Sequence, residues 1–128
     1  MSDKTVSWIG WVMSGLFGLF MLGASVAPKL MGLDVAQQSM MALGWVDAPL
    51  RLIGGLELVG TLLFLIPSTG LLGAALIMAI LGGAMATNIQ GNAPLYSHTL
   101  FSVYLGILMW GGLILRDPRI RAVFPLVR

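Results

Sequence analysis

The run Leu50-Arg-Leu-Ile-Gly-Gly-Leu-Glu-Leu-Val-Gly-Thr-Leu-Leu-Phe-Leu-Ile66 carries one carboxylate, Glu57, near its middle and one further charge, Arg51, at its start. The other residues are apolar or small, and a helix of this length approaches the thickness of a bilayer core at about 1.5 Å per residue. An ionised carboxylate inside a bilayer costs roughly 2.5 to 3.5 kcal/mol, so such a group usually has a partner or a function. Glu57 therefore marks the candidate functional region of the chain.

The composition is that of a membrane protein. Of the 128 residues, 58% are hydrophobic and only 9% are charged, whereas about a quarter of the residues are charged in soluble proteins. The sequence predicts a single domain over residues 1–128, without a linker. The net charge is +2, and the chain before the C-terminal segment has no cluster of basic residues with aromatic residues between them. The charges therefore point to membrane topology, and no nucleic-acid partner is expected.

Four apolar segments are predicted to cross the membrane as an all-α, four-transmembrane-helix bundle. Pro28, Lys29 and Gly32 are predicted to end the first crossing, and residues 34–44 to form a short helix at the membrane interface, with Gly44 ending it. A cleavable signal peptide is the rival interpretation of the first segment, but its apolar run exceeds the usual 7 to 15 residues. The four predicted spans are residues 7–27, 50–66, 71–87 and 99–115.

Small residues recur at every fourth position on two of these helices. Such ridges allow close helix packing in lipid, so both are predicted to face other helices. Around Glu57, the helical neighbours Gly54, Gly60 and Thr61 share its face, which places the carboxylate toward the bundle interior. The two ridges are Gly10, Ser14 and Gly18 in the first span, and Ala75, Ala79, Gly83 and Thr87 in the third.

The basic residues predict the orientation of the protein. Four crossings place both termini on one side, and that side carries five of the seven Lys and Arg residues. By the positive-inside bias, both termini are expected in the cytoplasm of a bacterium, with the protein in the inner membrane. The five residues are Lys4, Arg116, Arg119, Arg121 and Arg128, against Lys29 and Arg51 on the other side.

With this topology, most of the remaining polar residues gather in the outer half of the bundle. Glu57 and Tyr104 are predicted to line a pocket between the helices, with further polar groups at its mouth. The catalytic candidates are Glu57, His98 and Tyr104, and the ligand-binding candidates are Arg51, Lys29, Asn88 and Gln90. The chain has no cysteine and a single histidine, so no metal site is expected.

The state of Glu57 decides which chemistry it could perform. An unpaired buried carboxylate favours its protonated form and acts as a proton donor. Paired with Lys29 or Arg51, it stays ionised and can accept a proton, or it serves only as half of a structural ion pair. The sequence leaves these alternatives open.

Several motifs resemble those of the small DoxX-like membrane proteins. The similarity comprises Arg51-Leu-Ile-Gly-Gly-Leu-Glu57-Leu with Leu65-Ile-Pro67, Leu72-Gly73-Ala74, His98-Thr-Leu-Phe-Ser-Val-Tyr104-Leu-Gly, and Leu115-Arg116-Asp117-Pro118-Arg119. By this resemblance, Arg51, Glu57 and His98 occupy positions that match the pattern of the family. It also implies a histidine shortly after the third span, where this chain has Thr87-Asn88, and that departure weakens any mechanism that needs a histidine there.

The resemblance implies a link to membrane redox complexes, since the family is named for a subunit of a thiosulfate:quinone oxidoreductase. The predicted function is therefore a non-catalytic accessory subunit that binds a quinone or a similar lipophilic small molecule near Glu57. The alternatives are a cofactor-free acid-base isomerase or lyase acting on an apolar substrate, and a structural oligomeric membrane protein. No intrinsic cofactor is expected beyond a bound quinone or lipid. The expected partners are the bilayer, the small molecule, and further copies of the chain or a redox subunit.

Overall fold

The computed structural model describes residues 2–127, and throughout this range the chain forms helices and turns without a strand. The first helix begins at Asp3, where the Ser2 side chain accepts a hydrogen bond from the Thr5 N–H as the N-cap. The elements in order are α1 (Asp3–Phe20), η1 (Met21–Val26), α2 (Ala27–Leu30), α3 (Asp34–Ala42), α4 (Leu50–Leu65), η2 (Pro67–Thr69), α5 (Gly70–Gln90), η3 (Leu95–Thr99), α6 (Phe101–Arg116) and α7 (Pro118–Arg121).

The first helix extends beyond the predicted span of residues 7–27, because it continues through Pro28 and Lys29 to Leu30. It does so through η1, a π-helical stretch over Met21–Val26. Proline removes one hydrogen-bond donor and crowds the carbonyl four residues earlier, and a wider π turn relieves that crowding. The helix ends only at Gly32, whose φ of +64° allows Leu33 to donate back to the Pro28 carbonyl. The extra turn places Lys29 on a helix rather than in a loop.

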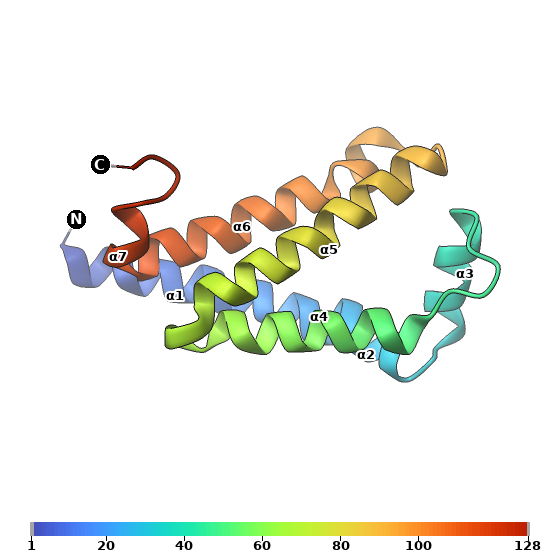
Figure 1. Ribbon diagram of the computed structural model, residues 1–128, viewed down its shortest axis with the longest axis horizontal. Helices are drawn as coiled ribbons and strands as arrows, with labels where there is room; N and C mark the ends of the chain where they lie inside the picture. Colours follow the sequence, from blue (N-terminus) through green and yellow to red (C-terminus); the bar gives the residue numbers. More distant parts are fainter. Residues whose placement is uncertain (1, 128) are drawn as a thin grey trace.

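The long helices pack around a shared core as an antiparallel bundle (Figure 1). The combined helix α1–η1–α2 lies between α6 and α4, and α5 contacts both α4 and α6. Both ends of the described chain lie at one end of the bundle, and α3 lies at the other (Figure 1). The core is formed by buried aromatic and aliphatic side chains, among them Phe17, Met21, Phe64, Ile77, Met109 and Leu113.

One of the two predicted small-residue ridges packs as expected. Gly10, Ser14 and Gly18 are all buried, and a side chain at Gly10 would overlap the backbone of Arg116 on α6. The prediction for α5 was wrong, because Ala75, Ala79 and Gly83 are exposed. The face of α5 that packs is Gly73, Ala74, Ile77 and Leu81 instead. An almost uniformly apolar helix has no polar side to indicate which face turns inward.

Among residues 2–127, three helices are long and apolar enough to span a membrane: Asp3–Leu30, Pro67–Gln90 and Leu95–Arg116. The fourth long helix, α4, has only sixteen residues, which at about 1.5 Å each gives about 24 Å against a hydrocarbon core of about 30 Å. The C-terminal end of α4 is capped by a residue of α6, Arg116.

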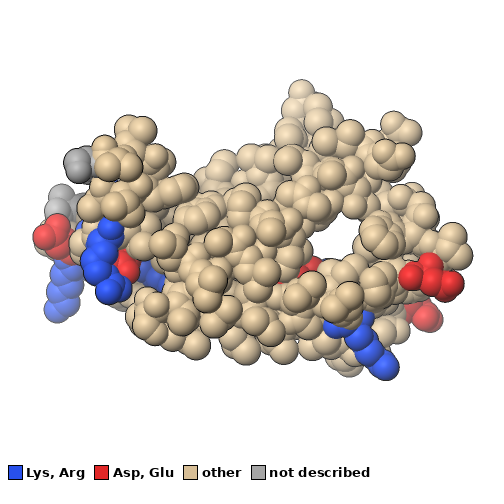
Figure 2. All heavy atoms as spheres, viewed as in Figure 1, with Lys and Arg blue, Asp and Glu red and all other residues tan. Residues whose placement is uncertain are grey.

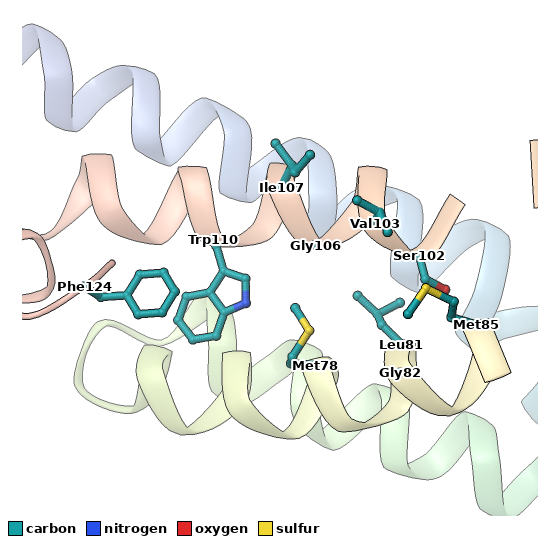
Figure 3. A pocket seen from close by; sticks show the side chains of 10 residues that line it. All are labelled: Met78, Leu81, Gly82, Met85, Ser102, Val103, Gly106, Ile107, Trp110 and Phe124. Atoms are coloured by element: carbon teal, nitrogen blue, oxygen red, sulfur yellow. The ribbon is translucent and has the colours of Figure 1, made fainter. Parts of the chain in front are cut away.

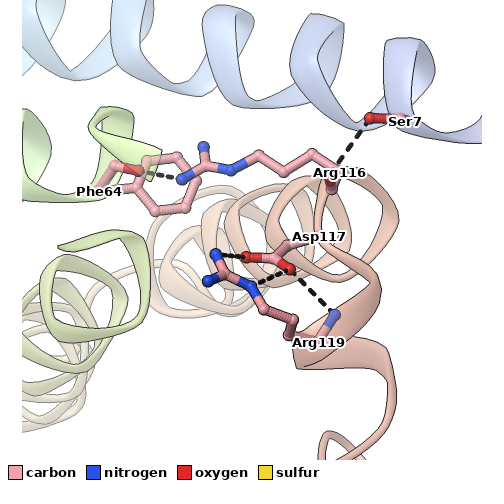
Figure 4. Close-up of polar contacts among 5 residues, drawn as sticks. All are labelled: Ser7, Phe64, Arg116, Asp117 and Arg119. Atoms are coloured by element: carbon pink, nitrogen blue, oxygen red, sulfur yellow. Dashed lines mark hydrogen bonds and ion pairs between the residues drawn. The ribbon is translucent and has the colours of Figure 1, made fainter. Parts of the chain in front are cut away.

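Arg116 reaches across the bundle to the C-terminus of α4 (Figure 4). It is 6% exposed, and its Nη2 donates to the Phe64 carbonyl. Its guanidinium lies over the rings of Trp11, at 4.3 Å, and Phe64, at 4.6 Å. A cation is favourable at a helix C-terminus, where carbonyls lack intrahelical partners. Arg116 therefore caps the C-terminal end of α4.

The last turn of the chain is fixed by a local ion pair. Asp117 is the N-cap of α7 and accepts from the Arg119 N–H at 3.0 Å, and the Arg119 guanidinium contacts the same carboxylate at 2.8 Å (Figure 4). The side-chain hydrogen bond from Arg119 holds the pKa of Asp117 below its ordinary value, against a smaller opposing effect of burial.

Candidate functional site

Glu57 is buried, at 4% exposed, and it is paired. The Lys29 Nζ lies 3.0 Å from its Oε1 and 3.3 Å from its Oε2. Ser25 joins the pair from the same helix as Lys29: its Oγ donates to Glu57 Oε2 at 2.7 Å and accepts from Lys29 Nζ at 2.7 Å. The pairing predicted with Lys29 as one of two possible partners is therefore present, and the three side chains form a closed triangle of contacts.

The local sequence explains how this triangle forms. Gly54 precedes Glu57 by one turn on α4, and a Cβ at Gly54 would lie 2.9 Å from the Cβ of Lys29. The missing side chain lets the Lys29 stem cross α4 at close range. Ser25 is four residues before Lys29, and both project toward α4 because η1 and α2 continue as one helix through Pro28.

A cavity of about 310 Å³ lies directly beside this triangle. Lys29 and Glu57 form one side, and apolar side chains from α3, α4 and α5 form most of the rest. Figure 2 shows an opening in the surface near the end of the bundle that holds α3. The other lining residues are Met40, Leu43, Trp45, Ile53, Ile80, Gly83, Ala84, Thr87 and Asn88.

The structure places one further ligand-binding candidate in this cavity. Asn88 lines it and donates from its Nδ2 to the Ala84 carbonyl at 2.8 Å. Gln90 lines a neighbouring hollow that shares Trp45 and Thr87 with the cavity. Arg51 is exposed at the start of α4, and within residues 2–127 it makes no side-chain hydrogen bond or ion pair.

The other two catalytic candidates lie elsewhere. His98 is exposed and contacts the Ser97 hydroxyl through its Nδ1 at 2.7 Å, beside a separate hollow of about 430 Å³. Tyr104 is 46% exposed and donates to the Tyr96 carbonyl at 3.0 Å. Tyr104 is not among the residues that line the Glu57 cavity. The predicted pocket shared by Glu57 and Tyr104 is therefore not formed, because Tyr104 faces outward on α6.

The sequence did not identify most of the residues around the cavity, among them Ser25, Leu43 and Trp45. Ser25 was missed because the helix was expected to end at Pro28, which would separate Ser25 from Lys29. Leu43 and Trp45 cover the cavity from the segment after α3, where Trp45 had been interpreted as an interfacial aromatic residue. The spacing of Ser25 and Lys29 by one helical turn was the one available signal.

The arrangement favours binding chemistry over metal chemistry. Within the described residues no group of three or more His, Cys, Asp or Glu side chains is placed to hold a metal ion. Glu57 corresponds to the paired case, in which the carboxylate oxygens can accept hydrogen bonds. No second titratable group lines the cavity besides its partner, Lys29.

A second cavity, of similar volume, is entirely different in character. It lies between α5 and α6, measures about 310 Å³, and is lined by apolar side chains with Ser102 as the one polar residue. Trp110 and Phe124 stack at one end of it, with ring centroids 4.4 Å apart, while Met85 and Ser102 lie at the other end (Figure 3). It offers no charge to orient a ligand.

The chain matches one protein-family model. The DoxX-like family model aligns with residues 12–112, a range that includes Ser25, Lys29, Glu57 and the whole lining of the cavity. No curated protein and no solved structure gives a significant match. Because the matched segment makes up well over half of the chain, the protein with this apolar helical bundle belongs to the DoxX-like family.

Proposed function

We propose that this DoxX-like membrane protein is an accessory subunit of a membrane redox system, and that it binds a quinone or similar lipophilic molecule in the cavity beside Glu57. The observation that carries the proposal is the cavity itself: about 310 Å³ of mostly apolar space with a buried Lys29–Glu57 pair on one wall. Ligand sites are typically apolar clefts with a few polar groups that fix orientation. A purely structural ion pair needs no such space beside it.

The proposal includes a four-crossing topology in the bacterial inner membrane. The combined helix α1–η1–α2, α4, α5 and α6 are the four crossings, and α3 lies at the outer interface. Its nine residues, Asp34–Ala42, include none that is buried, as expected of a helix lying on a membrane surface. Lys and Arg side chains gather at the end of the bundle that holds the termini (Figure 2), which favours a cytoplasmic position for that end.

Two adjacent glycines on α5 provide a matched test. Gly83 lines the Glu57 cavity and Gly82 lines the apolar cavity between α5 and α6. A Cβ at either position would meet no atom within 4 Å, so a larger side chain fills space without forcing the backbone apart. Gly83→Leu therefore blocks one cavity, and Gly82→Leu blocks the other.

The test measures binding of decylubiquinone to the purified protein in detergent, by quenching of tryptophan fluorescence. Trp45 lines the cavity, so a bound quinone should quench it. We expect saturable binding by the wild type and by Gly82→Leu, and at least about tenfold weaker binding by Gly83→Leu, a loss of about 1.4 kcal/mol. Equal, non-saturating quenching in all three proteins, or saturable quenching that persists unchanged in a Trp45→Phe variant, would reject the proposal.

A further inference from the structure

We infer that the cavity beside Glu57 selects an uncharged head group that donates a hydrogen bond, such as an alcohol, a phenol or a quinol, over a carbonyl-only or anionic head group. The inference rests on the proposed function, because it specifies the ligand of the same site. It is carried by the charges and by the unused hydrogen-bonding capacity of the residues that line the cavity.

The charge of the cavity wall excludes ionised ligands. Lys29 and Glu57 are the two charged residues of the lining, and they lie 3.0 Å apart. Their charges cancel, so neither a carboxylate nor an ammonium group would find a free counter-charge. Moving an ion from water into such a site costs several kcal/mol when no opposite charge compensates it. The favoured ligand is therefore uncharged.

The hydrogen-bond donors of Lys29 are already committed. Its Nζ has three hydrogens, and its contacts are Ser25 Oγ at 2.7 Å, Glu57 Oε1 at 3.0 Å, Glu57 Oε2 at 3.3 Å and the Ser25 carbonyl at 3.5 Å. A ligand carbonyl would have to displace one of these contacts. Ser25 therefore acts as a positioning residue, because it occupies the ammonium group that would otherwise bind an acceptor.

Acceptor capacity, in contrast, remains unused. Glu57 Oε2 accepts hydrogen bonds from Ser25 Oγ and Lys29 Nζ, whereas within residues 2–127 the one partner of Oε1 is Lys29 Nζ. A carboxylate oxygen can accept two hydrogen bonds. Asn88 donates one Nδ2 hydrogen to the Ala84 carbonyl, which leaves its Oδ1 as a second acceptor in the lining and its other Nδ2 hydrogen as a neutral donor. A ligand hydroxyl can donate to Glu57 Oε1 in a charge-assisted hydrogen bond, whereas a carbonyl can only accept from the neutral donors of the lining, which are Thr87, Trp45 and the second N–H of Asn88.

For a redox carrier the consequence is a preference between oxidation states. The reduced form carries hydroxyl donors and the oxidised form carries carbonyl acceptors. The cavity should therefore hold a quinol more tightly than the matching quinone. Because this preference depends on whether the ligand has a hydrogen-bond donor, it can be tested with redox-inactive probes that share one ring system and differ only in their head group.

The experiment compares three naphthalene probes at about pH 7 by isothermal titration with the wild-type protein in detergent, with Gly83→Leu as the reference for non-specific partition. The probes are 2-naphthol, 2-methoxynaphthalene and 2-naphthoate, which offer a neutral donor, a neutral acceptor and an anion. We expect 2-naphthol to bind at least about tenfold more tightly than either of the others. Equal or tighter binding of the ether or the carboxylate, still lost in Gly83→Leu, overturns the inference and leaves the proposed function standing.

A second arm uses Glu57→Gln, which leaves the Lys29 charge without its partner. The probe order should then reverse, with 2-naphthoate binding most tightly, because the cavity has become cationic. An unchanged order in folded Glu57→Gln would also overturn the inference. If no probe binds the wild type more tightly than it binds Gly83→Leu, the proposed function fails, and the inference fails with it. The wild-type comparison decides the matter even if the variant does not fold.

Discussion

Lys29 and Glu57 lie in contact inside the bundle, so removing either side chain leaves the other charge uncompensated. Breaking a buried ion pair in this way typically costs about 3 to 5 kcal/mol, whereas replacing both partners by apolar groups is often close to neutral. We expect Lys29→Met and Glu57→Leu each to lower the free energy of unfolding by about 3 kcal/mol. The double variant should recover most of that loss. Unfolding in mixed micelles measures all three.

Arg51 supplies the control for this cycle, because it is an exposed cation on the same side of the bundle. Arg51→Met should change the free energy of unfolding by no more than about 0.5 kcal/mol, as for most surface substitutions. If the double variant were as unstable as the sum of the single ones, the two side chains would not be coupled, and the pair would have no role in holding Ser25 and the cavity wall.

At the scale of single residues, the sequence identified Glu57 from its surroundings alone, because a lone carboxylate in an apolar run is costly. It also named Lys29 as one of two partners. It did not identify Ser25, whose position depends on a helix that continues through a proline. The sequence placed Tyr104 beside Glu57 because the two residues lie at a similar distance from the start of their helices, which predicts a similar depth in the membrane. Distance along a helix does not show which way the helix is rotated, so it could not show that Tyr104 faces outward.

Among the helices, α5 makes the closest backbone approach to α4 through a single glycine. A Cβ at Gly73 would overlap the backbone N of Phe64, whereas a Cβ at Gly82 meets nothing within 4 Å. Gly73→Ala should therefore destabilise the bundle by about 1 to 3 kcal/mol, since the backbones must separate. Gly82→Ala on the same helix should be neutral or stabilising by up to about 1 kcal/mol, from helix propensity. Similar stabilities of the two variants would contradict this packing.

The turn between α6 and α7 should respond to acid. Arg119 holds the pKa of Asp117 below its ordinary value of 3.8, so the ionised group stabilises the fold above that value, and the stabilisation is lost as the pH falls through the lowered pKa. Asp117→Asn keeps an N-cap acceptor but cannot ionise. We expect the wild type to be more stable than Asp117→Asn near neutral pH, with the difference shrinking once the pH falls below about 4 and disappearing only below the lowered pKa of Asp117. Thermal unfolding across this range measures the difference, and a constant difference would exclude the ion pair as its cause.

The helices themselves were largely readable from the sequence. The predicted segment 50–66 corresponds to α4, Leu50–Leu65, and 71–87 lies within α5, Gly70–Gln90. Gly44, with a φ of +98°, follows the end of α3 as predicted. The error at Pro28 arose because a π-helical stretch leaves no clear mark in a sequence, and the error in the packing face of α5 arose because that helix is apolar on every side.

Over the whole molecule, the proposed four-crossing topology predicts which positions are reachable from each side of the membrane. The chain contains no cysteine, so in a variant with one introduced cysteine all labelling of the protein by a thiol reagent comes from that position. Cysteines at Ser2 and Ser68 should react with an impermeant maleimide only after the membrane is opened, and cysteines at Gln38 and Asn92 should react in intact cells. Reaction of both the Gln38 and Ser68 positions in intact cells would show that α4 does not cross, whereas reaction at Ser2 and Ser68 with protection at Gln38 and Asn92 would show the reverse orientation.

The sequence by itself determined that this is an apolar helical membrane protein of the DoxX-like family with a costly carboxylate at its centre. Composition and hydrophobic length decide those features, because they reflect transfer of side chains between water and lipid, which each residue contributes largely on its own. Only the tertiary structure decided that Glu57 is paired through Ser25 and Lys29, that a cavity lies beside the pair, and that Tyr104 and His98 lie apart from it. These depend on the rotation and close approach of whole helices, which are set by contacts between residues far apart in the chain.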